Sequence, residues 1–226
     1  LSDLSALQPV DFEEFEDYLK VYQTPDGRTE TNSRVGIARK LSCLRSFYEY
    51  LCKRQLLSEN PVRLIDMPRL KEKAIIQLDP DEIAALLDYM ENYGNGLTGV
   101  QLYHYNKQKY RDIAIVTLLL GTGIRVSECV GLNISDVDFK NNGIRVLRKG
   151  GNEMVVYFGL EVEAALKDYL ELSRNKITPL SGHENALFLS GQRKRISVDA
   201  IEKMVKKYSS AISVKTITPH KLRSTY

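Results

Sequence analysis

The stretch GTGIRVSE, residues 121–128, follows a nearly all-apolar segment at residues 110–120. The apolar segment predicts a helix in the core, and the glycines that follow predict its end. Arg125 therefore leaves a rigid core element, and the carboxylate of Glu128 three residues later can hold its guanidinium in one rotamer. A guanidinium held in this way suits bidentate binding of a phosphate. A structural salt bridge is the alternative. A dinucleotide-binding loop is excluded, because one required glycine and a preceding strand are missing.

A basic hairpin follows this stretch. Residues 143–147 and 153–158 alternate between apolar and polar side chains, which predicts two strands joined by the turn KGGN at residues 149–152. The tip carries Arg148 and Lys149, and a mobile glycine turn can bring a cation into a groove or an active site. A solvated basic turn is the alternative. The glycine and lysine spacing of a Walker-type phosphate loop is absent.

The third motif is TPHKLR at residues 218–223. Thr218 is a good N-cap and Pro219 suits the first position of a helix. His220 and Arg223 then lie on one face, near a helix N-terminus that already favours anions. The pair is a candidate oxyanion site, and a surface histidine and arginine without a function is the alternative.

Residues 1–70 predict a small helical bundle. One amphipathic helix is expected over residues 11–22, and a longer helix is expected after Ser33, a good N-cap. The apolar stripe of the first helix is expected to comprise Phe12, Phe15, Tyr18 and Leu19. That of the second is expected to comprise Ile37, Leu41, Leu44, Tyr48 and Leu51, with Arg34, Lys40, Arg45, Lys53 and Arg54 on the opposite face. A linker is expected at residues 71–77.

Residues 78–226 predict a second domain. Its first helix is expected to start at Asp79 and Pro80, and its inward side chains are Ile83, Leu86, Leu87 and Met90. Further helices are expected over residues 160–175 and 198–211, with a short strand, ALFLS, at residues 186–190 between them. The expected fold is therefore mainly α with a small antiparallel β-sheet.

Charge is segregated along the 226 residues, although the net charge is only +3. Residues 31–73 carry +6 and residues 186–226 carry +7, whereas residues 1–30 and 74–185 carry −6 and −4. Solvated helix faces would explain one such basic segment. Two of them, one in each half, favour a polyanionic partner such as nucleic acid.

Composition and motifs exclude several classes of protein. A hydrophobic fraction of 43% and a charged fraction of 27% are those of a globular chain. No apolar run approaches the ~20 residues of a membrane span. The acidic N-terminal stretch is unlike a signal peptide, so the cytoplasm is the expected compartment. Neither the three cysteines nor the three histidines have metal-ligand spacing. We therefore expect no metal and no cofactor.

Taken in this order, the three motifs resemble the tyrosine recombinase, or phage integrase, family. The segment SRVGIARKLSCLRSFYEYL and the following NPVRLI resemble the core-binding domain of that family, so the resemblance covers essentially the whole chain. It is closest to the Xer-like integrases, and among them to those of conjugative transposons. The resemblance implies a helical DNA-binding domain at residues 1–70 and a catalytic domain at residues 78–226. These two domains would close as a clamp around duplex DNA.

The resemblance also implies residue roles. Arg125 and Arg223 match the catalytic arginines, Glu128 the supporting acid, Lys149 the hairpin lysine and His220 the histidine of the His-x-x-Arg pair. In this chemistry a tyrosine oxygen attacks the scissile phosphate and forms a 3′-phosphotyrosyl bond. The arginines and His220 stabilise the charge on the phosphate, and Lys149 protonates the leaving 5′-oxygen. The choice between Arg148 and Lys149 as the acid stays open. Tyr226 does not match the nucleophile, which is expected outside this chain, so these residues are expected to bind DNA without cleaving it.

DNA contacts are expected from basic side chains of both domains, mostly to phosphates. These side chains are Arg34, Lys40, Arg45, Lys53, Arg54, Arg148, Arg193, Lys194 and Arg195. The expected partners are double-stranded DNA at the ends of a mobile element and further copies of the chain, as a dimer or tetramer on DNA, in the bacterial nucleoid. An inactive DNA-binding regulator with the same fold is the main alternative. A phosphoesterase using His220 and a type IB topoisomerase are less well supported.

Overall fold

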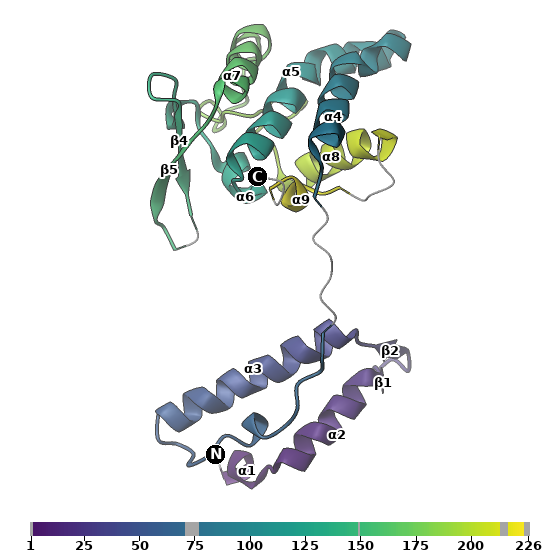
Figure 1. Cartoon of the computed structure of the whole chain (residues 1–226), viewed down its shortest axis with the longest axis vertical. Helices are drawn as coiled ribbons and strands as arrows, with labels where there is room; N and C mark the ends of the chain where they lie inside the picture. Colours follow the sequence, from purple (N-terminus) through teal and green to yellow (C-terminus); the bar gives the residue numbers. More distant parts are fainter. Residues whose placement is uncertain (1, 71–76, 149, 213–216, 224–226) are drawn as a thin grey trace. The chain divides into compact units, whose positions relative to one another are not determined.

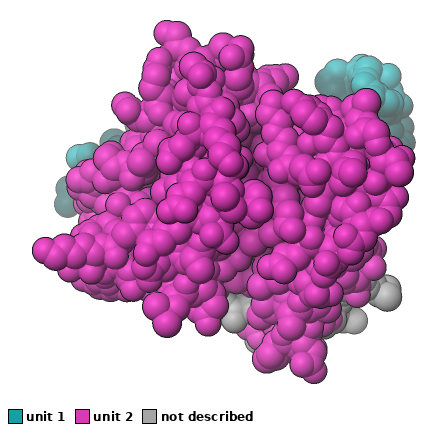
Figure 2. All heavy atoms as spheres, turned by 90° about the horizontal axis from the view of Figure 1, so that it is seen from above, with its two compact units in different colours: residues 1–74 teal, residues 75–226 magenta. Residues whose placement is uncertain are grey.

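The computed structural model describes residues 2–70, 77–148, 150–212 and 217–223. The chain divides into two compact units, Leu1–Ala74 and Ile75–Tyr226, which Figure 2 distinguishes by colour. Each unit has its own cluster of buried apolar side chains. Of the expected linker, 71–77, only Gln77 is among the described residues.

Unit 1, residues 1–74, is built from helices and one small hairpin (Figure 1). Its elements are α1 (Ser2–Ala6), α2 (Pro9–Lys20), β1 (Val21–Gln23), β2 (Thr29–Thr31), α3 (Arg34–Lys53) and the 3₁₀ turn η1 (Pro61–Arg63). β1 and β2 pair antiparallel with Tyr22 opposite Glu30. The expected helix over residues 11–22 is wrong for its last two residues, which belong to β1, because three residues are too few to show the alternating pattern of a strand.

The helices α2 and α3 bury one face each. From α2, Phe12 and Leu19 are buried, and the Phe12 ring meets that of Tyr48 edge to face at 5.4 Å between centroids. The expected α2 stripe is wrong for Phe15 and Tyr18, which are 36% and 53% exposed. A helix turns by about 100° per residue, so Tyr18 lies about 120° from Phe12, whereas Leu19 lies about 20° from it.

The apolar stripe of α3 is confirmed. Ser33 caps the helix by accepting a hydrogen bond from the Gly36 backbone N–H at 3.2 Å. Its buried residues are Ile37, Ala38, Leu41, Tyr48 and Leu51, and Leu44 packs against this cluster while partly buried. The outer face of this long helix is left to solvent.

Unit 2, residues 75–226, is also mainly helical and contains a small antiparallel sheet, as predicted (Figure 1). Its helices are α4 (Pro80–Asn92), α5 (Gly99–Thr122), α6 (Val126–Gly131), α7 (Leu160–Leu172), α8 (Val198–Ile212) and α9 (Pro219–Arg223), and its 3₁₀ turns are η2 (Tyr93–Gly96), η3 (Ile134–Asp136) and η4 (Arg174–Lys176). The sheet has the order β3 (Val137–Asp138), β4 (Gly143–Leu147) and β5 (Glu153–Tyr157).

The hairpin of β4 and β5 is the one that the sequence predicts, with Leu147 opposite Glu153 next to the turn. The expected strand at residues 186–190 is wrong. That segment is buried, but it forms only isolated bridges, Asn133 with Ala186 and Leu189 with Arg195. Burial alone explains its apolar run, because a buried loop and a buried strand have the same composition.

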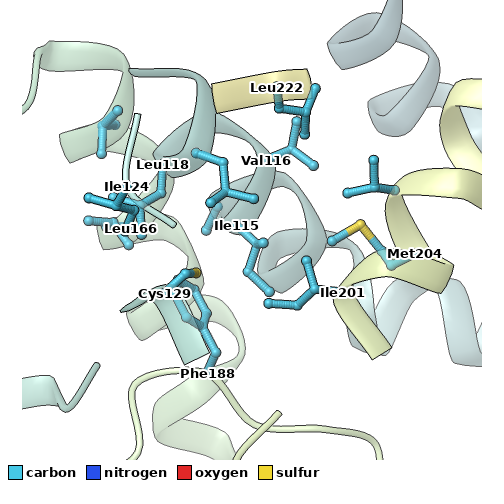
Figure 3. Packing of buried hydrophobic residues seen from close by; sticks show 14 of the residues in the cluster. Ile115, Val116, Leu118, Ile124, Cys129, Leu166, Phe188, Ile201, Met204 and Leu222 are labelled. Carbon is cyan, nitrogen blue, oxygen red and sulfur yellow. The ribbon is translucent and has the colours of Figure 1, made fainter. Parts of the chain in front are cut away.

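Helix α5 is the centre of unit 2. Its residues Ile115 and Leu118 pack among Leu166 of α7, Ile201 of α8 and Phe188 (Figure 3). Gly121 permits the close approach of α7, because a Cβ at this position would lie 2.6 Å from Val162 Cγ2. Gly123, at φ +59°, ends the helix in the left-handed conformation that glycine adopts without strain. Gly121 and Gly123 thus determine how closely α5 packs on α7 and where α5 ends.

Candidate active site

The candidate site begins at the turn between α5 and α6. After Gly123, Ile124 is buried and anchors the turn, and Arg125 occupies the N-cap position of α6. The Arg125 carbonyl accepts the first helical hydrogen bond, from Cys129 N–H at 2.9 Å. The backbone on both sides of Arg125 is therefore held by the core, as the sequence predicts.

Arg125 and Glu128 form a two-point contact. The Arg125 backbone N–H donates to Glu128 Oε2 at 2.7 Å, and Arg125 Nη1 donates to Oε1 at 2.7 Å. The Glu128 side chain is only 4% exposed, whereas that of Arg125 is 49% exposed. Burial opposes ionisation of Glu128, but the hydrogen bonds and charge of Arg125 outweigh it, and the pKa of Glu128 is lowered. A buried carboxylate thus holds a half-exposed guanidinium.

The His220 and Arg223 pair lies on α9, as the third motif predicts. Pro219 and Leu222 are buried, while His220 is exposed and Arg223 half-buried. The Thr218 carbonyl accepts hydrogen bonds from the N–H groups of Lys221 and Leu222. Helices α6 and α9 both pack against α5 and α8, at the lower edge of unit 2 in Figure 1. The same two helices therefore position Arg125 and the His220–Arg223 pair.

The hairpin tip contributes the remaining candidates. Lys149 lies outside the described residues. Arg148 is half-buried. Burial raises the pKa of Glu128, the contacts with Arg125 lower it more strongly, and the charge of Arg148 lowers it a little further. The charge of this hairpin residue thus acts on the carboxylate that holds Arg125.

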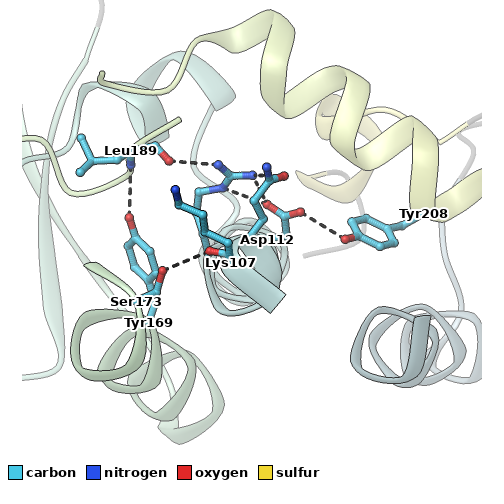
Figure 4. Close-up of polar contacts among 8 residues, drawn as sticks. Lys107, Asp112, Tyr169, Ser173, Leu189 and Tyr208 are labelled. Carbon is cyan, nitrogen blue, oxygen red and sulfur yellow. Dashed lines mark hydrogen bonds and ion pairs between the residues drawn. The ribbon is translucent and has the colours of Figure 1, made fainter. Parts of the chain in front are cut away.

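A second arginine–carboxylate pair is buried in unit 2 and was not predicted. Arg111 donates from Nε and Nη2 to Asp112 Oδ1 at 2.9 and 2.6 Å, and the Tyr208 hydroxyl donates to Asp112 Oδ2 at 3.2 Å (Figure 4). Arg111 Nη1 donates to the Leu189 carbonyl at 3.0 Å. The only sequence signal is the position of two charges at the start of an otherwise apolar stretch of helix. This buried network stabilises the fold of unit 2.

Eight of the nine expected DNA-contact residues fall into two groups, and the ninth is the half-buried Arg148 of the hairpin. Those with exposed side chains are Arg34, Lys40 and Lys53 of α3, Arg54 directly after it, and Arg193 and Lys194 of unit 2. Arg39, which the sequence analysis did not name, is also exposed on α3. At about 100° per residue it lies between Lys53 and Arg54 on the outer face, so helical periodicity could have found it.

Arg45 and Arg195 form the second group, and both bind backbone carbonyls instead of facing solvent. Arg45 donates to the carbonyls of Val62 and Ile65 at 3.0–3.2 Å. The expected position on the opposite face is wrong, because Arg45 lies four residues after Leu41 and three before Tyr48, on the buried face. Arg195 donates to the carbonyls of Val130 and Leu132 and to Asn133 Oδ1.

The comparisons with known proteins identify the family. Residues 77–226 match the phage integrase family. The chain belongs to this family. The tyrosine recombinase XerC of Roseiflexus castenholzii is 30% identical over 191 residues, which cover 84% of this chain and 57% of the relative. The tyrosine recombinase XerS of Streptococcus gordonii is 33% identical over 246 residues, which cover 100% of this chain and 68% of the relative. The chain thus spans between 57% and 68% of the length of these two relatives.

Two solved structures of integrase and recombinase chains share the fold. The Tn1549 transposon integrase in complex with circular intermediate DNA has a TM-score of 0.68 at 22% identity, over 98% of this chain and 71% of that one. The XerA recombinase has a TM-score of 0.55 at 26% identity, over 98% and 68%. The Xer-like resemblance of the sequence motifs is confirmed.

Metal clusters and membrane-spanning helices are both absent from the described residues. No group of three or more His, Cys, Asp or Glu side chains in that part of the chain is placed to hold a metal ion. None of its helices combines the length and the apolar character that a membrane crossing requires.

Proposed function

We propose that this member of the phage integrase family is a site-specific DNA recombinase that integrates and excises a mobile element, and that Arg125 binds the scissile phosphate. The observation that carries the proposal is the Arg125–Glu128 pair. A buried carboxylate fixes the guanidinium while half of its surface stays open to a ligand. This preorganised cation is what stabilisation of a charged phosphoryl transition state requires.

The other roles follow from the family motifs. Arg223 joins Arg125 in neutralising the non-bridging oxygens of the phosphate, and His220 donates a further hydrogen bond. A tyrosine oxygen forms the new bond to phosphorus while the 5′-oxygen leaves and takes a proton from Lys149. The tyrosine is assigned outside these 226 residues. The 5′-hydroxyl of a second strand reverses the step, so no metal or cofactor is assigned.

DNA binding is assigned to both units. Unit 1 offers the exposed cations Arg34, Lys40, Lys53 and Arg54, and unit 2 offers Arg148, Arg193 and Lys194. A clamp around duplex DNA, self-association on DNA and a place in the bacterial cytoplasm at the nucleoid are parts of this proposal. Relationship to the integrases of conjugative transposons is a further part. The fold shared with the Tn1549 integrase is consistent with it.

The test is formation of a covalent adduct on a nicked duplex that carries candidate element ends. The chain is incubated with this duplex, both as residues 1–226 and with any coding sequence that follows Tyr226, and SDS-resistant protein–DNA species are measured. We expect an adduct from the longer chain that R125Q and R223A abolish.

R145Q is the matched control, because Arg145 is 51% exposed and pairs with Asp136 at 2.9 Å, close to the geometry of Arg125 and Glu128. An adduct that survives R125Q would contradict the assignment of Arg125. DNA binding without an adduct from either chain would favour the alternative, an inactive DNA-binding regulator.

A further inference from the structure

Arg148 has a backbone that is fully held and a side chain that is not. Its N–H donates to the Asn152 carbonyl at 2.8 Å, and its carbonyl accepts from Gly151 N–H at 3.1 Å, which closes the hairpin turn. Its Nε is buried and makes no hydrogen bond within the described part of the chain. A buried donor without an acceptor is unfavourable, because the group has lost its hydration.

Other buried and half-buried arginines of this chain have hydrogen-bond acceptors within the chain. Arg45, Arg174 and Arg195 each donate to backbone carbonyls, and Arg111 also binds Asp112. Folding therefore supplies acceptors to arginines that stabilise the fold. Arg148 lacks one at Nε, which indicates that its acceptor comes from outside the chain.

The hairpin places this donor close to the Arg125–Glu128 pair. β4 packs against α6, and a cavity of about 380 Å³ is lined by residues that include Ser127 and Glu128 of α6 and Leu147 and Glu153 at the turn end of the hairpin. Arg148 directly follows Leu147. Its charge acts on the Glu128 carboxylate and contributes to the lowered pKa of that group.

We propose that Arg148 is a second phosphate-binding arginine of the site, whose Nε–H donates to an oxygen of the DNA phosphate that Arg125 binds. This inference rests on the proposed function. A phosphate fits because its oxygens are strong acceptors and its charge is opposite to that of the two guanidiniums. The role differs from that of Lys149, because an arginine binds the phosphate but does not deliver a proton.

The salt dependence of DNA binding tests this inference. Each phosphate contact by a cation contributes about −0.9 to the slope of log affinity against log salt concentration. Binding of a labelled DNA duplex is measured by fluorescence anisotropy between 50 and 200 mM salt for the unsubstituted chain, R148Q, R148K and R145Q. We expect the affinity advantage of the unsubstituted chain over R148Q to be about 3.5-fold larger at 50 mM than at 200 mM salt.

R148K separates the charge from the Nε–H donor. It is expected to keep the slope of the unsubstituted chain, because the charge is retained, and to bind about two- to tenfold more weakly, because the Nε hydrogen bond is lost. R145Q is expected to match the unsubstituted chain, because Arg145 belongs to none of the three motifs and its Nε already donates to Asp136, as does its Nη2. Thermal unfolding checks that each variant is folded. If R148Q does not fold, the affinity of R148K decides.

Two failures are distinguishable. If the unsubstituted chain and R145Q bind DNA, and R148Q has the same slope while R148K has the same affinity, Arg148 only balances the charge of Glu128 and the inference is wrong. If the unsubstituted chain and R145Q do not bind duplex DNA at all, the proposed function itself fails and this inference fails with it.

Discussion

The two arginine–carboxylate pairs Arg111–Asp112 and Arg125–Glu128 of unit 2 are alike in chemistry and differ in the exposure of the arginine. The shortest contacts are 2.6 Å in Arg111–Asp112 and 2.7 Å in Arg125–Glu128, and each carboxylate side chain is 4% exposed. The guanidiniums differ, because the Arg111 side chain is 10% exposed and that of Arg125 is 49% exposed.

The number of satisfied donors explains the difference. Arg111 uses Nε, Nη1 and Nη2 for Asp112, the Leu189 carbonyl and Gln108 Oε1, so it has little capacity left for a ligand. For Arg125, the hydrogen bond that the structure shows from the guanidinium is that of Nη1 to Glu128. The closed pair therefore stabilises the core, and the open pair presents a cation. Variants of the two pairs should separate stability from DNA binding.

The largest effect is expected from opening the closed pair. R111M should lower the free energy of unfolding by about 3–5 kcal/mol, because it leaves the buried charge of Asp112 without its partner. Urea denaturation followed by circular dichroism measures this loss. The double variant R111M/D112L removes both charges and should recover much of the stability. A loss of less than about 1 kcal/mol in R111M would show that the pair does not hold the core.

The open pair should give the opposite result. R125Q should weaken binding to duplex DNA by about 1.5–3 kcal/mol, which is the contribution of a hydrogen bond to a charged group. Its stability should change less, because Glu128 keeps the hydrogen bond from the Arg125 backbone N–H. Anisotropy titrations and urea denaturation of the same sample measure both quantities. Equal DNA affinity of R125Q and R145Q would contradict the distinction between the pairs.

Arg195 and Lys194 are adjacent basic residues that differ in the same way: Arg195 binds backbone carbonyls, whereas Lys194 is exposed. R195Q should destabilise the chain by about 1–2 kcal/mol, because the carbonyls of Val130 and Leu132 lose their donor, and should change DNA affinity little. K194Q should leave stability unchanged and reduce the salt slope of DNA binding by about 0.9. Thermal unfolding and anisotropy separate the two. The reverse pattern would place Arg195 at the DNA.

The smallest effect is expected from pH, because the two carboxylates act in opposite directions. Burial raises the pKa of Asp112 against the opposing effect of Arg111, so folding binds this proton more readily and the contribution of Asp112 improves as pH falls. The lowered pKa of Glu128 gives stability above its unfolded-state pKa, which is lost as pH falls through its folded-state value. Carbon-detected NMR titration should place Asp112 above 3.8 and Glu128 below 4.5. Shifts in the same direction would contradict the comparison.

Local sequence patterns were sufficient to predict an element where its cap, its turn or the spacing of its apolar side chains determines the structure. The cap at Asp79, the hairpin of β4 and β5 and the end of α5 at Gly123 are all where the sequence predicts them. The strands β1 and β2 and the buried loop at residues 186–190 were not predicted correctly, because their structure depends on what they pack against.

The site could be predicted as a set of motifs but not as a set of contacts. Glu128 was paired with Arg125 from their spacing, and the structure shows that contact. Nothing in the spacing indicated that the charge of Arg148, from the hairpin, would act on Glu128. The catalytic roles of Arg125, His220 and Arg223 stay predictions from the family motifs.

The sequence by itself determined most of the helices, the hairpin of β4 and β5, the family and the presence of two basic segments, because these depend on short-range periodicity and on ordered motifs. Only the tertiary structure decided what each arginine does. Arg111 and Arg195 have the same charge as Arg125 and Arg193, and no local pattern separated them; only for Arg45 does the helical spacing from Leu41 and Tyr48 indicate the buried face. The difference is how many donors of the guanidinium the fold satisfies, since an arginine whose donors are all satisfied stabilises the core and one with open donors keeps the capacity to bind a ligand.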